Sequence, residues 1–179
     1  VQNYNNFNDY VKLGSVLPKY NLGWRNDFNI GNIGFGAMLA GRIGGVAISM
    51  TQAALDHYGV SKESAEARDA GGVNINGYKV PAQSYFEERG KGRIAQYYTY
   101  SATNFRLQEA YVSYRLPRKL VNDKIDVTLS IVGRNLAMLY SKAPFDPEAV
   151  SSTGNYAQGL DYFMLPSLRS YGFSIKANF

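Results

Sequence analysis

The chain has 179 residues, which is enough for one domain with a core and gives no strong argument for two. Cysteine is absent and His57 is the single histidine, which excludes disulfides, thiol catalysis and multi-histidine zinc sites and leaves little support for a Ser-His-Asp triad. The net charge of +5 comes from scattered Lys and Arg residues, so nucleic-acid binding has little support. Aromatic residues make up 14% of the chain, and 18 glycines accompany them, which favours β structure with tight turns.

Two amphipathic strands are predicted at 19–30 and 33–43. In each of them alternate positions are apolar, which is the period of a β-strand with one apolar and one polar face. Gly31 and Asn32 lie between the strands and form a two-residue turn that tolerates positive φ. The two strands therefore form a hairpin.

Residues 44–103 show no dominant period and are predicted to form a long, elaborated loop. Three smaller elements are expected inside it: a helical turn at 51–58, a hairpin around Asn76-Gly77 within 73–80, and a short strand at 94–100. A second long loop is predicted at 136–167, where Pro and Asn turn signals recur.

Three further strands are predicted at 104–116, 124–135 and 168–179. In the first of them the apolar positions change face after Gln108 and Glu109, which indicates a β-bulge. In the last strand every second residue from Tyr171 onward is apolar, up to the end of the chain. A membrane-spanning helix is not expected, because no run of about 18 apolar residues is present.

The connections between these strands alternate between short and long. In an antiparallel meander alternate connections lie at the same end, so the short turns gather at one end and the long loops at the other, as in outer-membrane barrels. The strands also reach the length of about 9 to 11 residues that a tilted strand needs to cross a bilayer. The predicted fold class is all-β: an antiparallel transmembrane β-barrel segment of about five long strands with long extracellular loops.

Two alternatives remain open, because about five strands cannot close a barrel without leaving unsatisfied backbone groups at the edges. The long loop could hold about three more strands, which gives a free-standing eight-stranded barrel acting as an adhesin or structural surface protein. Alternatively, the apolar faces could cover the core of a soluble β-sandwich, such as a carbohydrate-binding module.

Five stretches, at 18–45, 71–86, 101–117, 132–148 and 165–179, resemble the C-terminal barrel region of the SusC/RagA-type TonB-dependent outer-membrane transporters. The most specific parts are Arg106-Leu107, Gly133-Arg134-Asn135-Leu136, Asp146-Pro147-Glu148 and the terminal aromatic strand. The resemblance runs in the expected order along nearly the whole chain from Pro18.

The resemblance implies a barrel of about 22 strands with an N-terminal plug, in the outer membrane of a Gram-negative bacterium. Such transporters import large nutrients, usually glycans and in some members peptides, with energy from the TonB system, under a surface lipoprotein of the SusD type. Residues 1–179 contain neither the plug nor a TonB-contacting segment, so we expect them to be the C-terminal part of such a barrel. No enzyme activity, cofactor or metal is expected.

Loop aromatic residues are the candidates for contact with the nutrient or a partner, and they are Tyr97, Tyr98, Tyr100, Tyr156, Tyr162 and Phe163. The alternative for each of them is packing of the loops against one another. Asp146, Glu148 and Asp161 offer oxygens to Ca²⁺, but their spacing is not that of a Ca²⁺ loop, so solvated loop carboxylates are expected.

Polar residues of the strands are the candidates for lining a wet lumen, and they are Arg25, Asp27 and Arg134. Pairing of these charges with one another is the alternative. The resemblance to other outer-membrane barrels also implies an assembly signal in the terminal aromatic strand, carried by Tyr171, Phe173 and Phe179.

Overall fold

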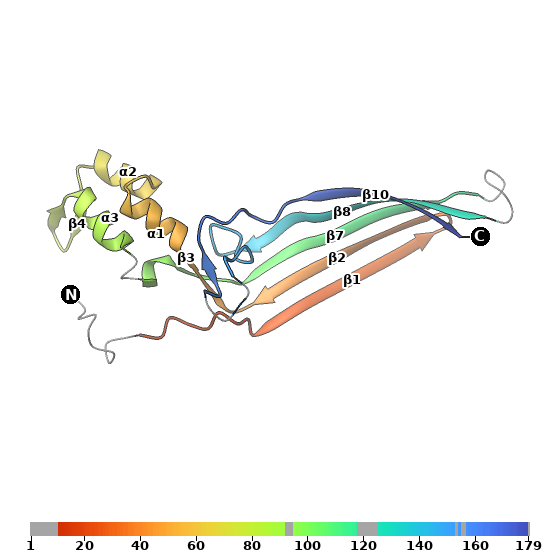
Figure 1. Ribbon diagram of the computed structural model, residues 1–179, viewed down its shortest axis with the longest axis horizontal. Coiled ribbons are helices and arrows are strands. Elements are labelled where there is room, and N and C mark those ends of the chain that lie inside the picture. The colour runs from red at the N-terminus through yellow and green to blue at the C-terminus, as the bar shows by residue number, and fades with distance from the viewer. Residues whose placement is uncertain (1–10, 92–94, 118–124, 153, 155–156, 179) are drawn as a thin grey trace. The chain divides into compact units, whose positions relative to one another are not determined.

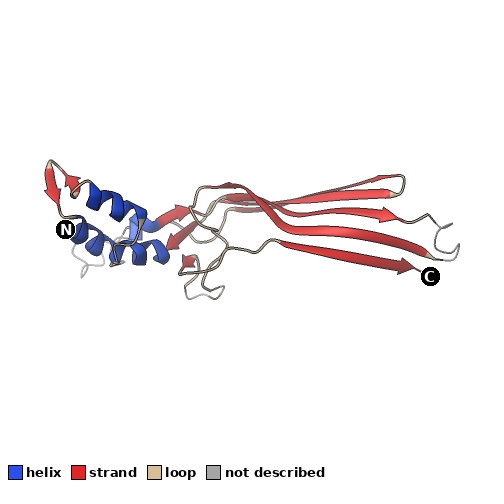
Figure 2. Ribbon diagram, turned by 90° about the horizontal axis from the view of Figure 1, so that it is seen from above, coloured by secondary structure: helices blue, strands red, loops and turns tan. Residues whose placement is uncertain are grey.

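A computed structural model describes residues 11–91, 95–117, 125–152, 154 and 157–178 (Figure 1). The chain forms two compact units. The first, called the lobe here, comprises 1–17, 45–101 and 150–164, and the second, called the sheet unit, comprises 18–44, 102–149 and 165–179. Figure 2 shows that the helices belong to the lobe and the long strands to the sheet unit.

The sheet unit is one antiparallel sheet in the order β1-β2-β7-β8-β10. Its strands are β1 (Tyr20–Ile30), β2 (Ile33–Ile43), β7 (Asn104–Arg115), β8 (Asp126–Ser141) and β10 (Ser170–Asn178). The strand predicted to end at 135 continues to Ser141. Its period of two is interrupted at Asn135, whose φ is 56°, and the pairing with β7 resumes at Ala137, so the interruption is a bulge and not the end of the strand.

One face of this sheet is apolar across all five strands. The register aligns one residue from each strand in a row, namely Phe28, Phe35, Val112, Ile131 and Phe173. Their exposed fractions lie between 38% and 64%, so nothing in the described chain buries this row. A soluble β-sandwich would cover such a face with a second sheet, so the structure does not support that alternative.

The predicted bulge in β7 is present. The register shifts between Leu107 and Glu109, and Leu107 and Ala110 therefore lie on the same apolar face although they are three positions apart, an odd number. Leu107 aligns with Leu39 and Ala110 aligns with Ala37. The extra residue, Gln108, thus keeps the apolar face continuous.

The short and long connections lie at opposite ends of the sheet, as predicted. Ile33, which follows the two-residue turn, pairs with Tyr114 near the end of β7, and Asn178 near the end of the chain pairs with Asp126 at the start of β8. The turn itself begins with Gly31, whose φ of 59° lies in the left-handed region that glycine tolerates. The segments that form the lobe leave the strands at the other end.

The described part of the lobe contains three α-helices and several short strands. Its elements are β3 (Val46–Ser49), α1 (Met50–His57), α2 (Lys62–Asp69), β4 (Val73–Ile75), β5 (Tyr78–Val80), α3 (Ala82–Gly90), a 3₁₀ helix (Ala95–Tyr98), β6 (Thr99–Ser101) and β9 (Leu160–Asp161). The predicted helical turn and the hairpin are both present, the latter with positive φ at Asn76 and Gly77. In the described part of the lobe the strands are short and form separate sheets, so they do not supply the three barrel strands of the eight-stranded alternative.

Two of these helices, α2 and α3, were missed by the sequence prediction. Ser61 caps α2 by accepting from the backbone N–H of Ser64, and the double glycine at 71–72 follows its end. Helix α3 buries Ala82, Phe86 and Gly90, which are four residues apart. No helix in the parts of the chain that the structure describes has the length and apolar character needed to cross a membrane.

Candidate functional site

The polar face of the sheet carries a connected network of charges. Asp27 on β1 accepts hydrogen bonds from the Arg25 guanidinium at 2.9 Å and from the Tyr111 hydroxyl at 2.7 Å. Glu109 on β7 bridges the arginines of two strands, with Arg134 Nε at 3.0 Å and Arg25 Nη1 at 3.9 Å. The three residues predicted to line a lumen thus lie on one face and pair through Glu109.

Small residues of β2 allow this network to form across an intervening strand. Asp27 lies on β1 and Tyr111 on β7, and β2 runs between them. A Cβ on Gly36 would collide with Asp27 Oδ1 and with the Tyr111 ring. Because Gly36 has no side chain, the carboxylate and the phenol meet above β2. The alternation of glycine with apolar residues in β2 is the sequence signal for this arrangement.

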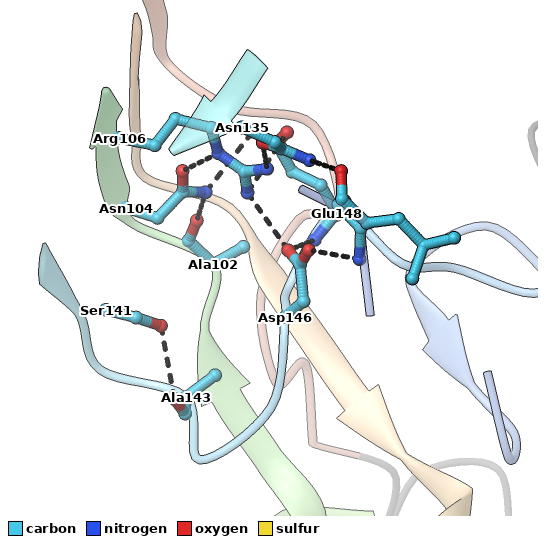
Figure 3. Close-up of polar contacts among 10 residues, drawn as sticks. Ala102, Asn104, Arg106, Asn135, Ser141, Ala143, Asp146 and Glu148 are labelled. Atoms are coloured by element: carbon cyan, nitrogen blue, oxygen red, sulfur yellow. Dashed lines mark hydrogen bonds and ion pairs between the residues drawn. The ribbon is translucent and has the colours of Figure 1, made fainter. Parts of the chain in front are cut away.

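A second cluster surrounds Arg106 on β7 (Figure 3). The Arg106 side chain is 5% exposed, and its Nη2 lies 3.0 Å from Asp146 Oδ1 and 3.2 Å from Glu148 Oε2. Its Nε and Nη1 donate to the side-chain oxygens of Asn104 and Asn135 at 3.4 and 3.5 Å. We call these five residues the Arg106 cluster. The guanidinium uses its donors on four partners, which is what a buried charge requires.

Asp146 connects the Arg106 cluster to the segment that leads into β10. One of its carboxylate oxygens accepts from the backbone N–H of Glu148 at 3.1 Å, and the other accepts from the N–H of Ser167 at 3.2 Å. Burial opposes ionisation of Asp146, but the hydrogen bonds from Ser167, Glu148 and Arg106 outweigh it and lower the pKa of the carboxyl below its ordinary value. The sequence motif contained these residues without showing their role, because their contacts span 40 positions.

The carboxylates considered for Ca²⁺ are not solvated, which corrects that prediction for Asp146 and Asp161. The Asp146 side chain is 8% exposed and occupied by the contacts above, and Asp161 is 5% exposed and accepts the Ser49 hydroxyl at 2.8 Å. Within the described residues no group of three or more histidines and carboxylates is arranged to hold a metal ion.

The tyrosines predicted at 97, 98 and 100 have three different environments. Tyr98 is 1% exposed and donates its hydroxyl to Asp56 at 2.8 Å, so it belongs to the core of the lobe, and its predicted contact with a nutrient or partner is wrong. Burial, aided by the bond to Asp56, raises the pKa of Tyr98 above its ordinary range. Tyr97 is 52% exposed, with its ring over the Arg89 guanidinium at 5.0 Å, whereas Tyr100 is half-buried in β6.

A buried ion pair holds the helices of the lobe together and was not foreseen. Arg89 of α3 lies 3.1 Å from Asp56 of α1, whose side chain is 0% exposed, and 2.9 Å from Glu63 of α2. The same guanidinium lies against the rings of Phe86 and Tyr98. A segment without a dominant period gives no sign of which charges will be buried.

Tyr162 and Phe163 are exposed side by side. Their exposed fractions are 59% and 57%, and their ring centroids lie 5.2 Å apart in an edge-to-face arrangement. Of the remaining candidates, Tyr171 and Phe173 lie exposed on the apolar face of β10. Tyr156 and Phe179 fall outside the described residues.

A small cavity lies among the three helices of the lobe. Its volume is about 250 Å³, and Phe86, His57 and Arg68 are among the residues that line it. This is smaller than the range of about 300 to 1,000 Å³ that is typical of ligand pockets. We therefore do not regard it as the binding site for a large nutrient.

Comparisons with known proteins agree with these features. No family model matches the chain. In sequence it is similar to "TonB-dependent receptor P3" of Formosa agariphila, with 24% identity over 174 residues, which cover 93% of this chain and 17% of that protein. In structure it is similar to a chain of the RagAB peptide importer in the "open-open" state, with a TM-score of 0.63 and 18% identity over 93% of this chain and 18% of that chain.

The chain thus spans less than one fifth of the length of either protein. Its antiparallel sheet and the RagAB match agree in fold, and the sequence match agrees with the family that the motifs of the chain resemble. The predicted resemblance is confirmed: the chain is similar in sequence to a TonB-dependent receptor and in fold to a chain of the RagAB importer.

Proposed function

We propose that this chain forms part of the barrel wall and of the extracellular mouth of an outer-membrane transporter that imports an oligosaccharide, or another large nutrient, with energy from TonB. The observation that carries the proposal is the apolar face of the sheet, with large side chains such as Phe28, Ile131 and Phe173 exposed on adjoining strands. An exposed apolar surface of this kind is unfavourable in water and favourable in lipid.

The opposite face fits the wall of a wet lumen. Arg25, Asp27 and Arg134 lie there in paired form, so they present hydrogen-bonding groups to water or to a passing nutrient without leaving an unpaired charge. In this proposal the short turns face the periplasm. The long connections, and with them the lobe, face the outside.

The proposed partners follow from the relatives. RagAB is described as a peptide importer, and the sequence resemblance implies a SusD-like surface lipoprotein over the mouth and a TonB complex that engages other parts of the protein. The nutrient is therefore an oligosaccharide or a peptide. We further propose that the terminal strand, with Tyr171, Phe173 and Phe179, acts as an assembly signal, so a polar residue at Phe179 should lower the amount of assembled barrel.

Uptake by the bacterium that encodes this chain tests the proposal. The gene for the full-length protein is deleted, and uptake of a panel of fluorescein-labelled oligosaccharides and peptides is compared with that of the parent strain and of a strain without functional TonB. We expect both strains to lose uptake of the same members of the panel, and complementation to restore it in the first. Unchanged uptake of the whole panel after deletion would contradict the proposal.

A further inference from the structure

We propose that Tyr162 and Phe163 form a preorganised aromatic contact for a protein partner that offers an apolar pocket, and that the lobe holds them in a strained backbone conformation for this purpose. The inference rests on the proposed function, in which a surface lipoprotein covers the extracellular mouth. It selects two of the six aromatic candidates and one class of partner.

The first observation is the backbone of Phe163, whose φ is 51°. Four described residues other than glycine have positive φ, namely Asn76, Asn135, Ala157 and Phe163. Asparagine tolerates the left-handed region, whereas a bulky aromatic residue there is a clear outlier. Residues held in this way concentrate at functional sites when their surroundings fix them.

The second observation is that the lobe fixes this position from two sides. The N–H of Phe163 donates to Thr51 Oγ1 at 2.6 Å. The preceding Asp161 is buried and accepts the hydroxyl of Ser49, the residue that also caps α1. Leu160 and Asp161 pair in parallel with β3. These contacts hold the backbone on which the two rings are displayed.

The third observation is that the rings gain little burial in return for the strained backbone of Phe163. Both rings are more than half exposed, and they contact one another instead of the core of the lobe. The free energy of burying an exposed ring offsets the backbone strain only when another molecule covers that ring. Preorganisation of this kind lowers the entropy lost on binding.

The composition of the segment selects a protein over a sugar. Residues 162–164 are Tyr, Phe and Met, all exposed, and the only polar side-chain atom among them is the Tyr162 hydroxyl. Sugar sites place hydrogen-bonding side chains around the aromatic ring. The centres of protein interfaces are instead enriched in Tyr, Phe and Met and depleted in charge.

The test uses the full-length transporter, purified in detergent, and a SusD-like surface lipoprotein from the same bacterium. Phe163→Asn keeps a residue that tolerates positive φ and removes the ring, and Tyr162→Ala removes the other ring. Tyr78→Ala is the matched control, because Tyr78 lies on the β4–β5 hairpin of the same lobe and is 78% exposed. We expect each of the first two variants to weaken binding roughly ten- to thirty-fold, and the control less than about two-fold.

The outcomes separate this inference from the proposed function. Unchanged lipoprotein affinity in Phe163→Asn and Tyr162→Ala, in a protein that still imports its nutrient, would overturn the inference alone. A weakened affinity for the nutrient with an intact complex would also overturn it and would assign the rings to the nutrient. Failure of the unaltered protein to import any nutrient would instead reject the proposed function. Phe163→Gly, which relieves the strain, replaces the Asn variant if that variant fails to assemble.

Discussion

Arg106 is a buried charge of the sheet unit that several neighbouring side chains bind. It is 4% exposed, and it pairs with both Asp146 and Glu148. Removal of one partner from a buried charge group is costly, because the charges that remain are neither hydrated nor paired. Exposed ion pairs of the same chemistry contribute far less, since water already solvates them.

We therefore expect Arg106→Gln to destabilise the folded full-length protein by about 3 to 5 kcal/mol. The measurement is the temperature at which the heat-modifiable band of the full-length protein disappears on electrophoresis. Arg115→Gln is the control, since its partner Asp126 lies 2.7 Å away but the Arg115 side chain is 54% exposed. Its cost should stay below about 1 kcal/mol. Equal losses of stability in the two variants would show that burial of the Arg106 cluster does not add to its contribution.

Asp146 gives the Arg106 cluster a defined pH dependence. Its pKa is lowered in the folded state, so its contribution to stability is complete above the ordinary carboxyl pKa of about 4 and is lost as the pH falls through the folded value. The amides of Glu148 and Ser167 donate to this carboxylate. Their hydrogen-exchange protection, corrected for intrinsic rates, should fall in acid below about pH 4. In Asp146→Asn the protection should be lower at neutral pH and nearly independent of pH, and an unaltered profile would refute the assignment.

At the scale of single elements, β7 shows how one residue sets the face of a strand. The residues before Gln108 and those after it share the apolar face only because Gln108 is extra in the pairing with β2. A shift of one residue moves every side chain of a strand to the opposite face. The bulge is therefore needed to keep the apolar residues before and after Gln108 on the same face.

Deletion of Gln108 should move either Phe105 and Leu107 or Val112 and Tyr114 from the apolar face to the polar face. Either change is equally damaging. We expect the deletion to abolish assembled, heat-modifiable barrel in the outer membrane. Gln108→Ala, which preserves the residue count, should assemble as the unaltered protein does. Normal assembly of the deletion variant would mean that the register of β7 is not fixed by this bulge.

The five long strands were predictable because their side chains alternate between apolar and polar over about ten residues. This alternation arises because each face of the sheet has a single environment. The lobe was only partly predictable. The Asn76-Gly77 turn has its own chemistry and was found. Helix α2, in contrast, is mostly polar, and contacts of Glu63 and Arg68 help to hold it in the lobe. The close approach of α3 to α1 depends on Gly90, where any Cβ would collide with the backbone of His57 and Ala53.

The candidate site was predictable in kind and not in detail. The polar face with Arg25, Asp27 and Arg134 followed from the alternation, but the residue that joins them, Glu109, did not. Tyr98 had the same residue type as its exposed neighbour Tyr97, and only the tertiary contact with Asp56 separates a core position from a surface one. Such contacts depend on residues far away in the chain, which a local pattern does not encode.

At the scale of the whole molecule, the account rests on the two faces of the sheet. If the apolar face meets lipid and the opposite face meets water, the exposed Phe, Ile and Val side chains need no protein cover. Every strand of the sheet contributes to this division, and the row from Phe28 to Phe173 crosses all five strands.

Accessibility of spin labels on neighbouring positions of β8 measures this division directly. The 179 residues contain no cysteine, so Ile131→Cys and Ser130→Cys place single labels on opposite faces of the same strand in a full-length protein freed of other cysteines. In lipid vesicles, we expect the label at 131 to collide with oxygen dissolved in the bilayer and the label at 130 with a water-soluble nickel complex. A label at 131 that is reached by the nickel complex and shielded from oxygen would contradict the account.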